Sequence, residues 1–304
     1  MTRRYFPLIF VLAAVWGASY LFIKVGVDGG FSPAALMAAR ALTAGAILLG
    51  YLAVTLGPKT TLVRLRAAWR PAIVLGALNA GVPFWLVAWG ETRIDSSIAA
   101  IAQATVPMFS LLIGFRFLRH ERIGPTRIGG LVLGLIGVII VAGVASAGDT
   151  GAVTGTLAVV LASVFYASAG IYGQLNLNST TSGPVLAAGS MLAGGLMLLP
   201  FAIARPPASM PTAGALGSLL LLAVVGTALA QLILFRVIEL FGARRLSLVT
   251  YLMPAFALVY GAVILDEHIT FVAIAGLALI LLGVALGSGA LKLRPRPGAA
   301  ASRL

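Results

Sequence analysis

Two prolines inside apolar segments each follow a polar residue at the same distance. Pro107 lies four positions after Gln103, and Pro254 lies four positions after Thr250. Each proline is expected to remove one backbone hydrogen bond and to kink its helix, and in lipid the freed carbonyl must find a partner or face a cavity. Gln103 and Thr250 therefore either satisfy the opened backbone or contact a substrate near the middle of the membrane. Both interpretations remain open from the sequence.

Other polar and aromatic residues could complete such a site. Asn79 and Gln231 interrupt apolar segments, and several large aromatic residues lie one helical turn apart. A Trp or Tyr near a helix end is usually explained by the membrane interface. Trp16 and Trp85 lie deeper, which favours a cavity. The expected substrate-binding residues are Trp16, Tyr20, Asn79, Trp85, Gln103, Tyr166, Gln231, Thr250 and Tyr251.

Lys24 and Arg40 fall within apolar segments. Charges inside a membrane are candidates for function, so this pair could form an outer gate or contact an anion. Alternatively they are satisfied helix-end charges, because Asp28 lies one turn beyond Lys24 and long side chains can reach water. The glutamates all fall at segment ends: Glu91, Glu121, Glu239 and Glu267. We therefore expect no buried carboxylate, the group that a pump for hydrophobic cations needs.

No set of residues resembles a catalytic centre. His120 and His268 each lie beside a Glu at an expected helix end. They could relay protons, but solvated loop residues are the simpler interpretation. The chain has no cysteine, which excludes disulfides, cysteine-ligated zinc and thiol catalysis. We expect no metal, no cofactor and a protein that is not an enzyme.

The composition identifies lipid as the solvent for most side chains. Of 304 residues, 60% are hydrophobic and only 10% charged, with a mean hydropathy of +1.07; a soluble domain has roughly 25% charged residues. The net charge of +13 could indicate nucleic-acid binding, but the charges lie in short gaps between apolar runs. We expect a bilayer and a small molecule as partners, no nucleic acid, and a monomer rather than an obligate oligomer.

Apolar segments of about 20 residues, long enough to cross a bilayer as helices, are separated by Gly, Pro and charge. The expected helices are 5–27, 33–56, 71–90, 96–117, 125–145, 151–174, 184–203, 212–238, 244–265 and 269–289. The sequence therefore predicts an all-α integral membrane protein with ten transmembrane helices. Residues 292–304 are expected to form a disordered cytoplasmic tail.

The distribution of Lys and Arg predicts the orientation of these helices. With both termini in the cytoplasm, all but four of the 21 basic residues lie on or beside the cytoplasmic face. An odd number of helices in each half inverts the second half. Glu121 then ends a helix inside, and its counterpart Glu267 ends one outside.

Two stretches of the chain have the same plan. Val106-Pro107 leads to Glu121, Gly130 and Gly137, and Met253-Pro254 leads to Glu267, Gly276 and Gly283. The glycines follow the Glu at the same two distances in both copies. Such a repeat predicts two inverted five-helix halves, residues 1–150 and 151–291. Gly-x-x-x-Gly spacings, Gly130 with Gly134 and Gly283 with Gly287, predict close helix contacts in both halves.

These residues resemble the EamA-type members of the drug/metabolite transporter superfamily. The similarity rests on Trp16-Gly17-Ala18-Ser19-Tyr20 with Lys24, on Ser32-Pro33 and Ala39-Arg40, and on the two proline-to-glutamate stretches. The resemblance implies ten helices in two inverted repeats in a bacterial inner membrane. It also implies a central cavity lined by helices one, three, four, six, eight and nine.

The expected function is a secondary transporter that exports amino acids or similar small amphiphilic metabolites by alternating access. A largely neutral cavity with aromatic and amide groups suits a substrate with an apolar side chain and a compact polar head. An exporter of cationic drugs and a nucleotide-sugar-like carrier remain alternatives. A membrane-embedded enzyme would need converging nucleophiles, carboxylates or metal ligands, which the sequence lacks.

Overall fold

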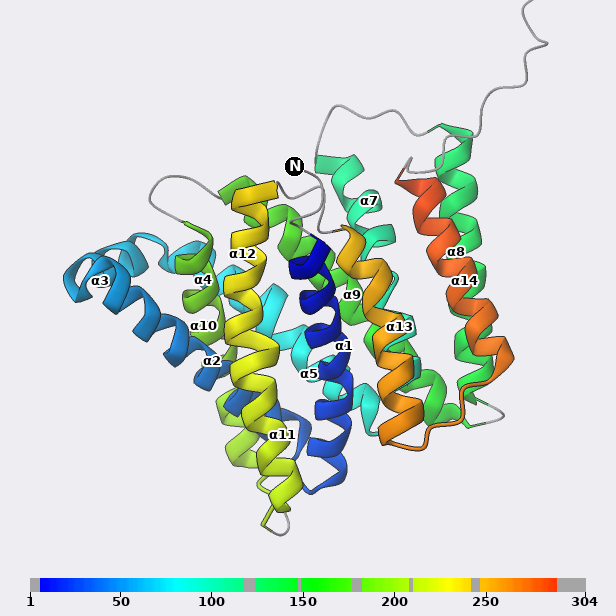
Figure 1. Cartoon of the computed structure of the whole chain (residues 1–304), viewed down its shortest axis with the longest axis horizontal. Helices are drawn as coiled ribbons and strands as arrows, with labels where there is room; N and C mark the ends of the chain where they lie inside the picture. Colours follow the sequence, from blue (N-terminus) through cyan, green and yellow to red (C-terminus); the bar gives the residue numbers. More distant parts are fainter. Residues whose placement is uncertain are drawn as a thin grey trace, which may run out of the picture.

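The computed structural model describes residues 6–117, 124–146, 149–176, 182–207, 210–241 and 247–288. In these residues the regular secondary structure is helical throughout, and the helices form one bundle (Figure 1). Three features considered above lie outside the described residues, namely His120, Glu121 and the tail 292–304.

The first half of the chain forms five spans. They are α1 (Phe6–Asp28); α2 (Pro33–Leu56); α4 (Trp69–Leu75) continued by the π-helical segment η1 (Gly76–Gly81) and α5 (Val82–Glu91); α6 (Ser96–Gln103) followed by α7 (Val106–Phe117); and α8 (Pro125–Ser146). Each matches an expected helix closely.

The second half repeats this plan. Its spans are α9 (Thr150–Asn176); α10 (Gly183–Ala204); α11 (Ala213–Ala223) continued by η2 (Val224–Leu229) and α12 (Ala230–Phe241); α13 (Ser247–Ile264); and α14 (Phe271–Gly287). In the described residues eight spans are long and apolar enough to cross a membrane, and two further apolar helices, Val249–Ile264 and Phe271–Gly287, are shorter. The prediction of a ten-helix membrane protein is confirmed.

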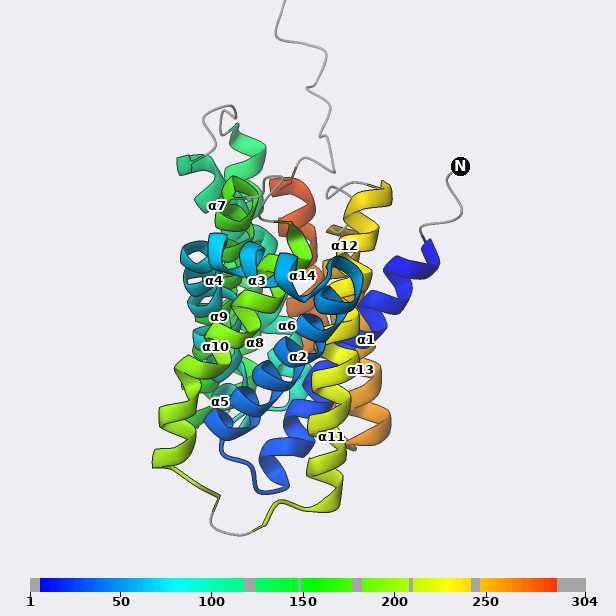
Figure 2. The same ribbon diagram turned by 90° about the vertical axis from the view of Figure 1, so that its left-hand side faces the viewer.

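Successive spans run in opposite directions (Figure 1). Helix α1 therefore descends in that view, whereas α9, which opens the second half, ascends. The start of α1 and the end of α14 lie at the same end of the bundle in both ribbon views (Figures 1 and 2). This is the arrangement of inverted halves with an odd number of spans each.

Local sequence explains where several helices begin. Ser32 precedes Pro33, and its hydroxyl oxygen accepts a hydrogen bond from the backbone N–H of Ala35 at 3.3 Å. Thr212 and Thr270 cap α11 and α14 in the same way, at 3.2 and 3.1 Å. A hydroxyl at this position satisfies one of the free N–H groups of the first turn.

One helix was not expected from the sequence. α3 (Pro58–Ala67) lies between the second and third spans and packs beside α2. It carries Lys59, Arg64 and Arg66 but also exposes Leu62 and Val63. A short helix with basic and apolar exposed side chains suits the interface between headgroups and hydrocarbon.

Helices α8 and α14 cross at very close range, and they belong to different halves. A Cβ placed on Gly130 would lie 2.6 Å from the backbone oxygen of Gly283, and one on Gly283 would lie 2.6 Å from the nitrogen of Gly134. No side chain fits between backbones at this distance. The predicted close contacts of these glycines are confirmed, and their partners are each other.

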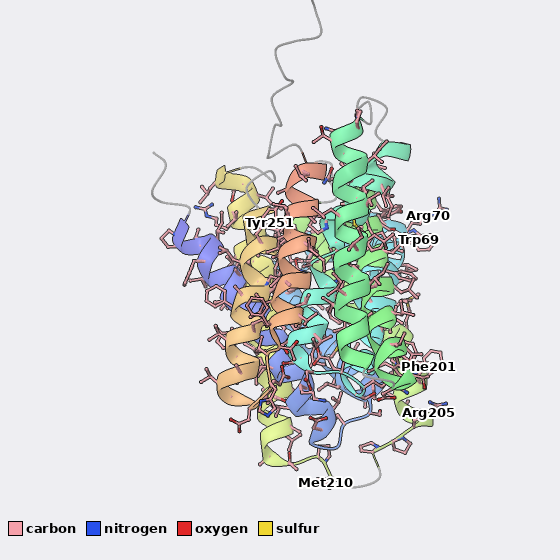
Figure 3. All side chains as sticks on the ribbon, turned by 90° about the vertical axis from the view of Figure 1, so that its right-hand side faces the viewer. Trp69, Arg70, Phe201, Arg205, Met210 and Tyr251 are labelled. Atoms are coloured by element: carbon pink, nitrogen blue, oxygen red, sulfur yellow. The ribbon has the colours of Figure 1, made fainter. Side chains whose placement is uncertain are left out.

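The two ends of the bundle differ in charge. One end, where α1 starts, is called the basic end and carries Lys59, Arg64, Arg66, Arg70, Arg127 and Arg236. The opposite end, which we call the acidic end, carries Asp28, Asp95, Asp149, Asp266 and Glu267 together with the three basic residues Lys24, Arg93 and Arg205. Arg70 and Arg205 mark the two ends in Figure 3.

Candidate functional site

A cavity of about 290 Å³ lies inside the bundle. Its described lining comes from the six spans implied by the resemblance and from one more, α2, which contributes Arg40. The volume is near the lower limit for small-molecule sites. Leu234 and Thr250 bring the cavity close to the basic end, because α12 ends and α13 begins there.

Seven of the nine expected substrate-binding residues line this cavity: Trp16, Tyr20, Asn79, Gln103, Tyr166, Gln231 and Thr250. Trp85 and Tyr251 are not among the lining residues. The ring of Trp85 lies beside that of Trp89, with centroids 6.1 Å apart. Tyr251 is half-buried on α13 toward the basic end (Figure 3).

Arg40 places a positive charge in the cavity wall. It is only 7% exposed, and its Nε donates a hydrogen bond to the Thr227 hydroxyl oxygen at 2.8 Å. The Thr227 hydroxyl in turn donates to the carbonyl of Leu222 at 2.8 Å. The guanidinium lies 4.0 Å from the centroid of the Phe84 ring. These contacts fix its plane, and no described acidic residue pairs with it, so the expected largely neutral cavity is wrong on this point.

Gln103 is the last residue of α6, where the fourth span is interrupted at Ala104 and Thr105 before Pro107 in α7. Its side chain is 4% exposed, and its Oε1 has no hydrogen-bond partner in the structure. The carbonyl that Pro107 leaves free needs a donor, so this acceptor oxygen cannot satisfy it. An orphaned buried acceptor in a cavity wall is suited to a donor on a bound molecule.

The rest of the wall is mainly aromatic and aliphatic. Trp16 and Tyr20 come from α1, and Phe84 on α5 lies 6.5 Å from Tyr166 on α9 between ring centroids. Pro254 lies inside α13, which continues through it, and the preceding Met253 faces the cavity. Flat apolar surfaces around a few polar groups suit a small amphiphilic molecule.

The sequence did not indicate Thr227 or the π-helical segments. η1 holds Asn79 and η2 holds Gly226 and Thr227, all of which line the cavity. π-Helical turns often mark functional sites because they displace the helix register. The internal repeat contained a usable signal, because Asn79 and Thr227 occupy matching places in the third spans of the two halves. The remaining lining residues that were not expected are Ser19, Ile23, Phe84, Val87, Val106, Gly226, Leu234 and Met253.

Lys24 lies outside the cavity lining, near the acidic end. Its Nζ donates to the backbone carbonyl of Glu91 at 2.9 Å and lies 3.6 Å from a carboxylate oxygen of Asp28. Glu91 is 0% exposed. The expectation that the chain lacks a buried carboxylate is therefore wrong. Glu91 does end its helix as predicted, but α1 and the start of α6 pack around that end instead of leaving it in water.

No group of three or more His, Asp or Glu side chains in the described residues could hold a metal ion. The cavity holds one cationic side chain, amide and hydroxyl groups and aromatic rings. Such a set can recognise a polar head group and an apolar body.

Comparison with known proteins supplies the family. The model of the EamA-like transporter family matches residues 4–143 and again residues 153–288. A probable terminal-alkyne amino-acid exporter of Streptantibioticus cattleyicolor is 30% identical over 274 residues, covering 89% of this chain and 89% of that protein. The uncharacterized inner membrane transporter YedA of Escherichia coli K12 is 31% identical over 206 residues, 65% of this chain and 62% of that protein.

The fold also matches a solved crystal structure. That chain superposes with a TM-score of 0.68 at 18% identity, covering 93% of this chain and 97% of the other. At this identity the likeness concerns the fold alone.

Proposed function

This chain belongs to the EamA-like transporter family, and from that premise we propose that it exports amino acids or similar small amphiphilic metabolites by alternating access. The cavity is the substrate site in this proposal. The two halves rock about it, so that the site opens to one face of the membrane at a time. We further propose a bacterial inner membrane, both termini in the cytoplasm, a monomer, and transport without chemical change of the substrate.

The observation that carries the proposal is the buried guanidinium of Arg40 in the cavity wall. It has no acidic partner among the described residues, and its Nε is held by Thr227. A carboxylate on the substrate would supply the missing negative charge and accept charge-assisted hydrogen bonds. Arginine is well suited to this role because its planar fork matches a carboxylate.

Gln103 supports recognition of the other end of an amino acid. Its free Oε1 can accept a hydrogen bond from an ammonium group, which has donors but no acceptor. The aromatic residues Trp16, Phe84 and Tyr166 then offer an apolar surface to the side chain. The relative named a probable amino-acid exporter is consistent with this substrate class.

The alternatives receive less support. A cationic drug would have to enter a cavity whose charged lining residue is itself a cation. A nucleotide sugar is large for a cavity of about 290 Å³. The distribution of charge supports the proposed orientation. With both termini in the cytoplasm, the basic end lies on the cytoplasmic side, in agreement with the positive-inside rule.

Counterflow uptake in liposomes tests the proposal. Liposomes that contain the purified protein are loaded with an unlabelled amino acid, and uptake of the labelled amino acid from outside is measured. Each amino acid is compared with the amine that lacks its carboxylate. We expect wild-type protein to prefer the amino acid. Arg40→Gln should raise the substrate concentration for half-maximal transport by about 10- to 100-fold, the loss expected for a hydrogen bond to a charged group. It should also remove the preference for the amino acid over the amine. Arg236→Gln, an exposed arginine paired with Glu239, is the matched control. Equal transport of acid and amine by wild-type protein would contradict the proposed substrate class.

A further inference from the structure

Glu91 is a buried carboxyl group that the substrate site does not use. It is the last residue of α5, it is 0% exposed, and neither carboxylate oxygen has a hydrogen-bond partner in the structure. Val87, one turn earlier on α5, lines the cavity. The carboxyl therefore lies just beyond the cavity, on the side of the acidic end.

The surroundings of this carboxyl do little to stabilise its ionised form. An ion moved out of water costs several kcal/mol unless hydrogen bonds and partners replace the water. Glu91 has none of these bonds, and its place at the end of α5 puts it near the negative end of the helix dipole. A protonated carboxyl avoids most of this cost.

The nearby charges have other contacts. The groups that act electrostatically on Glu91 are Lys24 and Asp28 of α1, Arg40 of α2 and Glu267 after α13. The Tyr20 hydroxyl of α1 also interacts electrostatically with Glu91. Lys24 is the nearest candidate partner, yet its Nζ donates to the main-chain carbonyl of Glu91 and approaches Asp28 instead. On α9 the residues packed against Gly90, which precedes Glu91, are the uncharged Gly155 and Val159, and the Cβ of Arg93 also lies against Gly155.

The residues at the acidic end near this group are buried. Ile23 is 3% exposed, Ser96 1% and Ser97 2%. Gly90 approaches the backbone of Gly155 so closely that a Cβ would lie 2.9 Å from its carbonyl oxygen. Water from the acidic end reaches Glu91 if these contacts separate, which is the movement that opening toward that end requires.

We propose that Glu91 is the proton-binding site that couples export to the proton gradient. This inference rests on the proposed function and adds its driving ion. When the acidic end opens, the hydrated Glu91 carboxylate takes a proton from the outer water and becomes a neutral carboxyl. The neutral carboxyl can be buried as the acidic end closes. On the cytoplasmic side the proton leaves through the cavity, and the ionised Glu91 favours reopening with substrate bound.

Three measurements on reconstituted protein test this site. The first is exchange of labelled for unlabelled amino acid without a pH gradient, and the second is net transport driven by a pH gradient. The third is the pH-difference infrared spectrum, in which a protonated carboxyl has its own carbonyl band. We expect Glu91→Gln, an uncharged isostere of the protonated acid, to retain exchange within about a factor of two, to lose gradient-driven accumulation, and to lack the carboxyl band. Glu239→Gln, at an exposed glutamate, should behave as wild type in all three.

The outcomes separate the two proposals. No exchange of any amino acid by wild-type protein overturns the proposed substrate class, and the infrared band then still decides whether Glu91 holds a proton. Gradient-driven accumulation by Glu91→Gln at the wild-type rate, or no carboxyl band in wild-type protein, overturns the role of Glu91. If Glu91→Gln does not purify as a folded species, wild-type protein containing isotope-labelled glutamate replaces it. The shifted band must then persist in Glu121→Gln, Glu239→Gln and Glu267→Gln, and its loss in one of these would reassign the site.

Discussion

The carboxylate of Glu267 accepts hydrogen bonds from the backbone N–H groups of Ser96 and Ser97, at 2.7 and 3.0 Å. Ser96 begins α6 in the first half of the chain, whereas Glu267 follows α13 in the second half. Asp95, which precedes α6, makes no capping bond with its own side chain. One half of the transporter therefore caps a helix of the other at the acidic end.

Removing this contact should destabilise the closed acidic end. Glu267→Ala leaves two N–H groups at the start of α6 without their acceptor, and the loss of such a cap costs about 1–2 kcal/mol. We expect a lower apparent melting temperature in detergent, with Glu267→Gln intermediate because one acceptor oxygen remains. Glu239→Ala removes a pair that is exposed on both sides and should change the temperature little. Equal effects of Glu267→Ala and Glu239→Ala would exclude a capping role.

The crossing of α8 and α14 predicts opposite effects at adjacent glycines. Gly130→Ala forces the added carbon against the backbone of Gly283, whereas a Cβ on Gly129 meets no atom within 4 Å. Gly130→Ala should lower the apparent melting temperature and the yield of monodisperse protein. Gly129→Ala should be neutral or stabilising, since alanine is favoured over glycine in a helix by up to about 1 kcal/mol. Thermal scans of the two purified variants make the comparison, and a stable Gly130→Ala would show that the helices can separate.

The cavity lining predicts which aromatic and polar residues affect substrate affinity. Gln103→Leu removes a free acceptor and breaks no bond in the structure, so we expect weaker substrate binding by about 1–3 kcal/mol with folding retained. Trp16→Ala should also raise the apparent KM, because Trp16 lines the cavity. Trp85→Ala is the matched control outside the lining. Initial rates normalised to folded protein give KM, and an effect of Trp85→Ala as large as that of Trp16→Ala would mean that the cavity is not the substrate site.

The absence of native cysteine allows a direct test of orientation. Thr60 is exposed on α3 near the basic end, and Met210 is 88% exposed near the acidic end (Figure 3). A membrane-impermeant thiol reagent on intact cells should label Met210→Cys and spare Thr60→Cys until the membrane is permeabilised. The reverse labelling pattern would invert the proposed topology.

Asp95 predicts a pH dependence at the acidic end. Partial removal of its carboxyl from water raises the pKa of Asp95, and the nearby charge of Glu267 raises it further. The folded protein then holds this proton more tightly than the unfolded chain, whose Asp pKa is about 3.9. The free energy of unfolding therefore falls as pH rises from that value through the raised one. Asp95→Asn removes this component, so its apparent melting temperature should fall less than that of wild type over this range. In a Glu267→Gln background, Asp95→Asn should have a smaller effect. If Asp95→Asn alone leaves the pH profile of the apparent melting temperature unchanged, the prediction is contradicted.

The ten spans could be predicted because each depends on a local property, the length of an apolar run between breaks. The lining of the cavity was largely predictable because Asn79, Gln103 and Gln231 are costly in lipid and must face the interior. Glu91 was misjudged because burial of a helix end depends on which neighbours pack there. Whether α1 and α6 cover the end of α5 is a long-range property that residue spacing does not encode.

The two π-helical segments bear on the history of the chain. A π-helical turn holds one more residue than the α-helical turn it replaces, so η1 and η2 each record an added residue. They occupy the same place in the third span of each half, and one addition that preceded the gene duplication accounts for both. Since the duplication, the side chains on the turn have diverged to Asn79 and Thr227, while the backbone irregularity has been inherited by both descendants.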